Sequence, residues 1–596
     1  MLSFAMPGTT ASLLVAAIIV AVYALYRAAL PKPIPGIPYD AASSHRLLGN
    51  VPDMLANIKK SEGTFITYVT DLMDSLNSPI IQVFIRPFGK PLVILADFRE
   101  AHDLMTRRKE FDRSDVVGDL FLGVAPNHHI RQKTNDTFKA QRRLIQDLMT
   151  PTFLHDVAAP AILKKVNLLM DLWRVKARAA RGHPWVANAD LNHMSLDAIS
   201  AFAFGAGFQH SAVQPDLDAV MAQDYNLPAS KDEPIVFAKG QKDQLLQSIL
   251  DLTHTIGEVQ GNPSPRLTWA YVMRKPKIKK AAKSKDDCLK RELQDAVKRF
   301  QNGNDQDVKL RSAVDRMILN EKDLAEKDGR SPEYFSGVMI DEVYCPPGES
   351  SELELTTVQL FGFIFAGHET TSTALCWGLK FLADNRDTQD RLREALWTSF
   401  ATAKEQAREP TIEEITGARV PYLEATMEEI LRCAGAASFV DRQAMVDTQL
   451  LGYGIPKGTS VTTLVTGASM MRPAFQVDEA RRSASSQSAK KNGHDRAWDP
   501  SDISSFKPER WLATSEKGTT FDATAGPQLA FGLGTRGCYG KRLAYVEIKI
   551  FLTVMIWNFE LLKCPPALSG YKSNLYMTHE PRSCYVRLRE VGPVDA

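Results

Sequence analysis

The stretch FGLGTRGCYG, residues 531–540, decides the fold of this chain. It sets a single cysteine, Cys538, among glycines at positions 532, 534, 537 and 540. Glycine has no Cβ, so this backbone can turn tightly and approach a flat partner closely. The next segment, KRLAYVEIKIFLTVMIWNF, predicts a long apolar helix, and both its N-terminal end and Arg536 favour the thiolate form of Cys538. A thiolate on a glycine-shaped turn is suited to axial ligation of a haem iron.

The rest of the composition is that of an ordinary globular protein. Of 596 residues, 44% are hydrophobic and 24% are charged, which indicates neither a disordered chain nor a polytopic membrane protein. The 72 basic and 70 acidic side chains give a net charge of +2, so the charge balance does not indicate a nucleic-acid-binding protein, which would need a strongly basic domain. The seven cysteines show no C-x-x-C spacing, which predicts reduced thiols instead of a disulfide framework or a structural zinc site.

The N-terminus predicts a membrane anchor, with a buried helix as the alternative. No charged side chain precedes Arg27, and Ala11 to Leu30 supply about the 20 residues that cross a bilayer as a helix. Basic residues follow this run and do not precede it, which places the body of the protein in the cytosol. The expected organisation is a transmembrane anchor over 1–30, a stiff proline-rich linker over 31–39, and one catalytic domain over 40–596 with a flexible surface insertion at 481–495.

The cysteine stretch resembles the haem-binding signature of a known family. The pattern F-x-x-G-x-R-x-C-x-G, matched by Phe531, Gly534, Arg536, Cys538 and Gly540, is similar to that of the cytochrome P-450 monooxygenases. The resemblance implies a mainly α (α+β) fold, with a large helical domain, small β-sheets and haem b between two central helices. It also implies that Cys538 is the axial thiolate ligand of the iron.

A second motif lies in the apolar stretch QLFGFIFAGHETTSTALCWGLKFL, residues 359–382. Glycine and threonine are poor helix formers, so their run inside a buried helix predicts a local kink at Ala366 and Gly367, with Thr370 on the same face. The run resembles the family element (A/G)-G-x-(D/E)-T-(T/S). The resemblance implies that Glu369 and Thr370 guide protons to dioxygen, and it assigns no ligation to His368.

A third motif, E-x-x-R, predicts a structural cluster. Glu429 and Arg432 stand at i, i+3 and so share one helix face. Such a pair alone is usually a surface ion pair that contributes little to the stability of the fold. The resemblance to the family implies that both residues join Arg510 of FKPERW and hold the backbone behind the cysteine loop.

The two haem propionates need cationic partners if they are buried. The resemblance offers Arg142, Arg442 and Arg536 for this role. The chain departs from the family at Phe138, where a tryptophan is usual, which leaves Arg142 the least secure of the three. It also lacks the usual proline soon after the E-x-x-R helix, a change that bears on the substrate cavity.

The substrate contacts are expected on the interrupted helix and after the E-x-x-R helix, with a further loop around residues 121–129. The residues predicted to touch the substrate are Phe361, Phe365, Ala366, Ala437, Phe439 and Val440. Their apolar character implies a lipophilic small molecule.

The implied activity is a haem-thiolate monooxygenase that hydroxylates or epoxidises its substrate. The style of the motifs is similar to fungal enzymes of terpenoid or polyketide secondary metabolism. No flavin- or nicotinamide-binding motif is fused to the chain, so electrons are expected from a separate NADPH-cytochrome reductase, with cytochrome b5 as an additional donor. The residues expected to form the basic docking face are Lys139, Arg143, Lys541 and Arg542.

The expected location is the endoplasmic reticulum membrane, as a single-pass protein whose catalytic domain faces the cytosol. Two other functions remain open from the sequence. One is a haem-thiolate isomerase or dehydratase that works without a reductase, and the other is a non-enzymatic membrane haem-binding protein. Glu369 and Thr370 count against both, because neither function needs a proton path to dioxygen.

Overall fold

The computed structural model describes residues 8–262, 264–302, 310–332, 334, 360–491, 496–516 and 518–591. The chain divides into two compact units. Unit 1 comprises Met1–Phe111, Asp441–Leu464 and Ala474–His494, and unit 2 comprises Asp112–Val440, Val465–Pro473 and Asp495–Ala596. The expected catalytic domain over 40–596 therefore contains parts of both units, and its boundaries stay a prediction.

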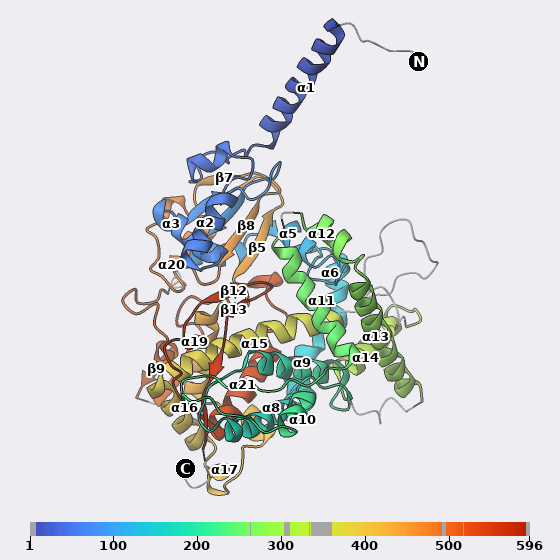
Figure 1. Ribbon diagram of the computed structural model, residues 1–596, viewed down its shortest axis with the longest axis vertical. Helices are drawn as coiled ribbons and strands as arrows, with labels where there is room; N and C mark the ends of the chain where they lie inside the picture. The colour runs from blue at the N-terminus through green and yellow to red at the C-terminus, as the bar shows by residue number, and fades with distance from the viewer. Residues whose placement is uncertain are drawn as a thin grey trace. The chain divides into compact units, whose positions relative to one another are not determined.

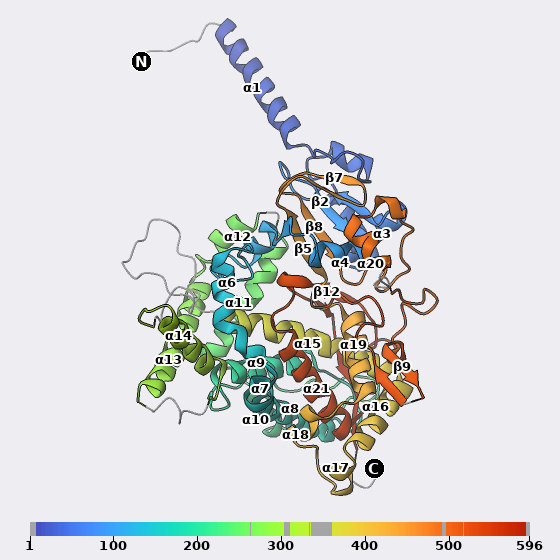
Figure 2. The ribbon, with the colours of Figure 1, turned by 180° about the vertical axis from the view of Figure 1, so that it is seen from behind.

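Unit 1 begins with the apolar helix α1 (Gly8–Ala29), which stands clear of the rest of this unit in Figures 1 and 2. Its stretch Ser12–Ala29 is long and apolar enough to cross a membrane, with a mean hydropathy of 2.0. Large apolar side chains are exposed along this helix, as in Leu13, Ile19 and Val20. A helix with apolar side chains exposed to this degree fits a lipid environment better than water.

The proline-rich segment after α1 differs from the stiff spacer that its composition predicts. Gln82, which is fully buried in strand β1 (Ile80–Val83), accepts a hydrogen bond from the Ile34 amide at 2.8 Å. Its side-chain amide donates to the carbonyls of Ile34 at 2.9 Å and Ile37 at 2.8 Å. Three bonds from one glutamine therefore fasten the segment to the sheet, and proline content alone does not reveal them.

The sheet of unit 1 has the strand order β1-β2-β8-β5-β3. Strand β1 runs antiparallel to β2, with Ile80 opposite Leu95, and β2 runs parallel to β8, with Val93 opposite Val461. The strands are β1 (Ile80–Val83), β2 (Leu92–Leu95), β8 (Ser460–Leu464), β5 (Phe439–Ala444) and β3 (Phe111–Asp112), and a hairpin joins β6 (Thr448–Leu450) to β7 (Tyr453–Ile455). The helices of this unit, besides α1, are α2 (Val51–Ser61), α3 (Phe65–Ser75), α4 (Phe98–Thr106) and α20 (Ala484–Lys491).

Helix α20 falls within the segment 481–495, for which we expect a flexible insertion. Arg482 pairs with both carboxylate oxygens of Asp97 at 2.7 Å, and both groups are buried. The hydroxyls of Ser483 and Ser485 donate to Asp103 at 2.6 and 2.8 Å. The buried pair of Arg482 and Asp97 therefore anchors the start of this helix, the flexible insertion stays a prediction, and residues 492–495 lie outside the described part of the chain.

Unit 2 is mainly helical. Its long helices are α8 (Ala159–Ala180), α9 (Asn188–Phe204), α11 (Gln244–Gln260), α13 (Pro276–Asn302), α14 (Ala313–Lys327), α15 (Leu360–Asp384), α16 (Arg386–Ser399), α19 (Pro421–Ala434) and α21 (Lys541–Asn558). Its shorter helices are α5 (Asp115–Leu120), α6 (Asp136–Ile145), α7 (Pro151–Phe153), α10 (Gln214–Met221), α12 (Pro265–Val272), α17 (Ala401–Glu405) and α18 (Ile412–Gly417). The structure confirms the expected mainly α fold with small sheets.

Among the described residues, four two-stranded sheets complete unit 2. They are formed by β4 (Trp185–Val186) with β14 (Tyr585–Val586), β9 (Leu512–Ser515) with β10 (Gly518–Phe521), β11 (Phe559–Leu561) with β15 (Leu588–Glu590), and β12 (Ser573–Leu575) with β13 (His579–Pro581). Strand β13 of the last pair packs on α15.

Helix α15 is the centre of unit 2, where it lies beside α9, α19 and α21 in both views (Figures 1 and 2). A Cβ added at Gly367 would stand only 2.7 Å from the Ile199 side chain of α9. Gly367 therefore lets the two helices pack closely, a role that the sequence does not reveal. Nearly all of α15 is buried by this packing, which makes its few open positions informative.

Candidate active site

The cysteine loop is shaped by two glycines with positive φ angles. Gly532 has φ +58° and Gly534 has φ +68°, values that residues with a side chain rarely adopt. The Cys538 amide then donates to the Phe531 carbonyl at 2.7 Å and closes the turn. Helix α21 begins three residues later, at Lys541. The pattern of glycines thus folds as the sequence predicts.

The Cys538 sulfur lies at the N-terminal end of α21. It accepts hydrogen bonds from the backbone amides of Gly540 and Lys541. Its side chain keeps open surface, yet surrounding atoms bury it enough that burial is the main influence on its pKa. An axial ligand for a bound planar group needs this placement.

The charge around Cys538 differs from the expectation. Burial raises the pKa of the thiol, and it outweighs the lowering by the two amides, Arg142 and Lys541. Arg536 instead donates to the carbonyls of His129 at 3.2 Å and Gln132 at 2.7 Å. The amides at the start of α21 thus favour the thiolate, as the sequence predicts, but burial outweighs them. The contribution expected of Arg536 stays a prediction. A cation bonded to the sulfur would supply the missing stabilisation.

Arg142 reaches the cysteine loop through Tyr539. Its guanidinium lies 4.4 Å from the centre of the Tyr539 ring, and burial lowers its pKa. Tyr539 also stacks on Phe363 of α15, with ring centres 6.0 Å apart. The structure thus brings α6, the cysteine loop and α15 together. Arg442, by contrast, belongs to unit 1, where it is buried and donates to the Asp441 carbonyl, so its relation to the loop stays a prediction.

The open positions of α15 gather around Thr370. Between Leu360 and Leu382 every residue is buried except four: Ala366, Gly367, Glu369 and Thr370. The Thr370 hydroxyl donates to the Ala366 carbonyl at 2.7 Å. The expected kink does not interrupt the helix, which runs unbroken from Leu360 to Asp384. The room on this face instead comes from the small side chains.

His368 points to the buried side of the same helix. It has no exposed surface, and its Nδ1 lies 2.6 Å from the Ile364 carbonyl. Burial lowers its pKa, so the ring is neutral at physiological pH. This placement is that of a packing residue. Among the described residues no cluster of three histidine, cysteine or acidic side chains could hold a metal ion.

The E-x-x-R residues form a buried cluster with Arg510. Glu429 and Arg432 have no exposed surface and make two hydrogen bonds of 2.7 Å to each other. Arg510 donates to the same carboxylate at 2.9 Å, and Trp511 donates to it at 3.0 Å. Arg432 also donates to the carbonyls of Met470, Ile503 and Ser505, at 2.6, 2.8 and 3.0 Å. The cluster thus ties α19 to loops more than thirty residues further along the chain.

Comparison with known proteins decides the family. The family model described as Cytochrome P-450 matches residues 54–475 and 497–581. The chain belongs to the cytochrome P-450 family. The unmatched residues 476–496 contain the segment that the sequence predicts to be an insertion.

Three similar proteins are fungal monooxygenases, and each matches this chain over nearly its whole length. The chain is 42% identical to cytochrome P-450 monooxygenase TRI13 of Fusarium sporotrichioides, over 96% of this chain and 98% of that protein. It is 36% identical to monooxygenase GME11363 of Pestalotiopsis microspora, over 98% of both chains. It is 34% identical to monooxygenase xilC of Penicillium crustosum, over 96% of this chain and 95% of that protein. The general activity is therefore that of an oxidoreductase of the monooxygenase type, as the sequence predicts.

Solved structures agree on the fold. The crystal structure of the heme domain of cytochrome P-450DA aligns with a TM-score of 0.64, covering 95% of this chain and 99% of that chain, at 17% identity. At so low an identity the similarity shows the cytochrome P-450 fold alone. Haem with a cysteine ligand is the cofactor of this family, and the open, surrounded sulfur of Cys538 fits that cofactor.

One aromatic residue, Phe138, marks where this cytochrome P-450 departs from the family pattern. Phe138 replaces the usual tryptophan, and the Arg536 guanidinium lies 4.0 Å from the centre of its ring. A cation over an aromatic face is attracted by the ring even without an indole donor. Phe138 therefore holds Arg536 in place.

The predicted substrate contacts fall into two groups. The rings of Phe361 and Phe365 are buried, with Phe361 under the Lys285 ammonium at 4.8 Å and Phe365 stacked on Phe121 at 5.3 Å. Both rings lie inside the core, and their contact with a substrate stays a prediction. The other predicted contacts, which keep open surface, are Ala366, Ala437, Phe439 and Val440. Val440 also packs against the glycine turn, 3.5 Å from where a Cβ of Gly532 would stand.

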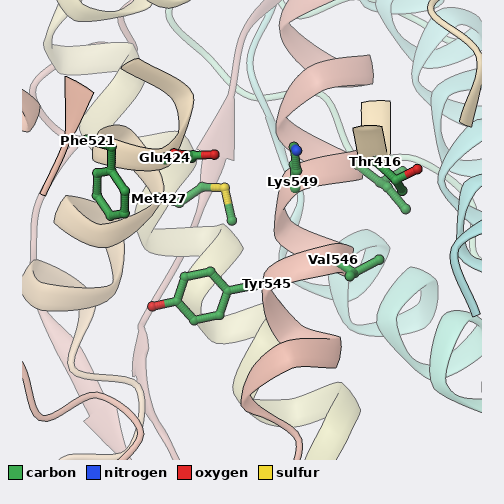
Figure 3. A pocket seen from close by; sticks show the side chains of 8 residues that line it. Thr416, Glu424, Met427, Phe521, Tyr545, Val546 and Lys549 are labelled. Carbon is green, nitrogen blue, oxygen red and sulfur yellow. The ribbon is translucent and has the colours of Figure 1, made fainter. Parts of the chain in front are cut away.

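A separate pocket of about 370 Å³ lies between α18, α19, α21 and β10. Figure 3 shows Tyr545 extending from α21 toward the helix that carries Met427. The Lys549 ammonium donates to the Ala418 carbonyl at 2.7 Å. The residues that line the pocket are Thr416, Glu424, Met427, Phe521, Tyr545, Val546, Lys549 and Ile550. None of them belongs to the predicted active site.

Proposed function

We propose that this cytochrome P-450 inserts one oxygen atom of dioxygen into a lipophilic small molecule, by hydroxylation or epoxidation, with Cys538 as the axial thiolate ligand of haem b. The observation that carries the proposal is the Cys538 side chain, which keeps open surface and whose sulfur accepts hydrogen bonds from the amides of Gly540 and Lys541. The match to fungal monooxygenases over nearly the whole chain supports a role in fungal secondary metabolism. Terpenoid and polyketide skeletons are the substrates we propose.

Each part of the site has a role in this reaction. When bound, haem supplies the redox chemistry that activates dioxygen. Cys538 donates electron density through its sulfur, and the two amides that bond the sulfur stabilise its charge. Arg142 and Arg536 would hold the propionates, with Arg442 as the third candidate. The small side chains around Ala366 leave space for an apolar substrate beside the Thr370 hydroxyl, which holds and passes a proton.

Thr370→Ala tests the proposed proton path. We expect NADPH consumption to continue, because the electron supply is unchanged, while product formed per NADPH falls by roughly 10²-fold, a typical contribution of positioned proton transfer. The measurement compares NADPH consumed with product formed in reconstituted membranes. Thr370→Ser keeps the hydroxyl and should restore most of the coupling. Unchanged product formation in Thr370→Ala would favour an isomerase or dehydratase over a monooxygenase.

We also propose that α1 anchors the enzyme in the endoplasmic reticulum membrane, with the catalytic body in the cytosol. The apolar surface of α1 and the basic residues that follow it support this orientation. Four exposed basic side chains support docking of an NADPH-cytochrome reductase, or of cytochrome b5, on α6 and the start of α21. They are Lys139, Arg143, Lys541 and Arg542.

Deletion of residues 1–30 is expected to release the enzyme from membranes without unfolding it. The cut leaves Ile34 and Ile37 in place, so the bonds from Gln82 remain. The measurement is the fraction that resists alkaline carbonate extraction from microsomes. As a control, Val20→Arg keeps the length of the helix. It adds about 2.5 to 3.5 kcal/mol to the free energy of inserting the helix into the membrane, so it should weaken the anchor. A deleted chain that still resists extraction would contradict an anchor in α1.

A further inference from the structure

The pocket beside α21 is built mainly by two helix faces and lies outside the predicted active site (Figure 3). Glu424 and Met427 stand at i, i+3 on α19 and so share one face of that helix. The residues that line the pocket from α21 are Tyr545, Val546, Lys549 and Ile550. The volume of about 370 Å³ falls in the range of about 300 to 1,000 Å³ that is typical of small-molecule sites.

The lining of the pocket is mostly apolar, and two of its polar side chains are already bonded elsewhere. The apolar lining residues are Met427, Phe521, Val546 and Ile550. The Tyr545 hydroxyl donates to the Glu428 carboxylate, so Tyr545 offers the pocket its ring. The Thr416 hydroxyl donates to the Ile412 carbonyl of its own helix at 2.7 Å. A ligand that fills this pocket must therefore be largely apolar.

Glu424 and Lys549 are the polar lining groups that remain for a ligand, one on each helix. Among the described residues, no hydrogen bond or ion pair of the Glu424 carboxylate is found. The Lys549 ammonium donates to the Ala418 carbonyl at 2.7 Å and carries two further N–H groups. Burial lowers the pKa of Lys549, and the charge of Glu424 acts in the opposite direction, so the two groups lie within electrostatic reach. Figure 3 shows Glu424 extending from α19 toward the side of the pocket where Lys549 lies.

A hydroxyl group matches this pair of charged groups. Its O–H can donate to the Glu424 carboxylate while its oxygen accepts from the Lys549 ammonium. Both bonds are charge-assisted and therefore stronger than bonds between neutral groups. A carboxylate on the ligand would face the like charge of Glu424, and an amine would face that of Lys549, so each is opposed by one of the two residues. The polar group of the ligand is therefore neutral.

We propose that this pocket binds a lipophilic alcohol or phenol whose hydroxyl bridges Glu424 and Lys549. The apolar body of the ligand then lies against the apolar lining and the Tyr545 ring. That ring also contacts the Phe531 ring of the cysteine turn, with ring centres 5.4 Å apart, so the ligand rests on a residue that supports the turn. Neither bridging residue belongs to the predicted haem site or proton path, so binding here does not depend on the proposed reaction.

The first test compares two probes on the purified holoenzyme, with the haem iron saturated by an azole so that the active site is occupied. Isothermal titration calorimetry should show that 4-phenylphenol, a rigid lipophilic phenol, binds at one site. The methyl ether 4-methoxybiphenyl keeps the apolar body and the oxygen but has no O–H group, so we expect it to bind at least roughly tenfold more weakly. Equal affinities of the two probes, or no binding of 4-phenylphenol while the azole is bound, would overturn the proposal.

The second test locates the bound probe with variants of the lining. Val546→Trp fills the pocket and should abolish binding of 4-phenylphenol, while Glu424→Gln and Lys549→Met should each weaken it by roughly tenfold. Glu413→Gln is the matched control, because Glu413 is an exposed carboxylate on the neighbouring α18 that does not line the pocket, and its affinity should equal that of the wild type. Thermal unfolding without the probe shows whether each variant is folded.

Two results of these titrations would refute the site. Wild-type affinity in folded Val546→Trp would show that the probe binds elsewhere. Wild-type affinity in both Glu424→Gln and Lys549→Met would show that no hydroxyl bridge forms. Since Glu424→Gln keeps the shape of a side chain that is only partly buried, it should fold even if the larger tryptophan at position 546 does not.

Discussion

Cys538→Ala is expected to abolish haem binding while the polypeptide keeps its fold. Alanine retains the Cβ and the backbone amide, and it is this amide that closes the turn onto the Phe531 carbonyl. The φ angles of Gly532 and Gly534 do not depend on the sulfur. Because the cysteine side chain already has open surface, its truncation leaves no sealed cavity. The free energy of unfolding of the haem-free chain should therefore change by less than about 1 kcal/mol.

The loss of the sulfur should show in the pigment. We expect the haem content of purified Cys538→Ala to fall to background and the carbonyl spectrum of the reduced protein to lose its thiolate band. Thermal unfolding of the haem-free chains separates this result from misfolding. Cys288→Ala is the matched control, because Cys288 is buried in α13 and should leave the haem content unchanged. Wild-type pigment in Cys538→Ala would refute the assignment of the ligand.

The parts of the site that the sequence predicts well are those that depend on local backbone geometry. Glycines at 532 and 534 are required by positive φ angles, and the helix after Cys538 begins where its apolar run begins. The spacing of Glu429 and Arg432 places them on one helix face by the helix period alone. Such features need only a few neighbouring residues, so one sequence suffices to predict them.

The parts that the sequence does not predict depend on contacts between distant segments. Gln82 fastens Ile34, which lies 48 residues away along the chain. Gly367 looks like a helix breaker in the sequence, whereas its structural role is close packing against Ile199 of another helix. No periodicity or composition encodes these pairings.

The charges around Cys538 show the same limit. The sequence places Arg536 two residues from the sulfur and so suggests that it stabilises the thiolate. In the folded chain Arg536 bonds the carbonyls of His129 and Gln132, while Arg142, nearly four hundred residues away in sequence, acts on the sulfur. The position of a residue in the sequence therefore does not show which groups its charged side chain contacts, because the packing of the folded chain decides this.

Glu429→Gln is expected to destabilise the enzyme by about 3 to 5 kcal/mol. The Glu429 carboxylate accepts hydrogen bonds from Arg432, Arg510, Trp511 and the Lys507 amide, and it has no exposed surface. Glutamine has nearly the same shape, but it carries no charge and turns an NH₂ group toward these donors. The buried Arg432 guanidinium then loses its counter-charge, while Arg510 keeps Asp502 at 3.1 Å. Because a domain is stable by only about 5 to 15 kcal/mol, the yield of folded protein should fall sharply.

The measurement is denaturant unfolding followed through the haem spectrum, with Asp295→Asn as the matched control. Asp295 and Lys298 have the same i, i+3 spacing in α13, at 3.5 Å, but their side chains are 53% and 68% exposed. An exposed pair contributes about 0 to 1 kcal/mol, so the control should stay close to the wild type. Arg510→Lys keeps the charge and loses the bonding geometry of the guanidinium, so it should fall between the two. If Glu429→Gln unfolds at the same denaturant concentration as Asp295→Asn, the buried cluster contributes no more to the free energy of unfolding than an ordinary surface pair does, and the prediction is wrong.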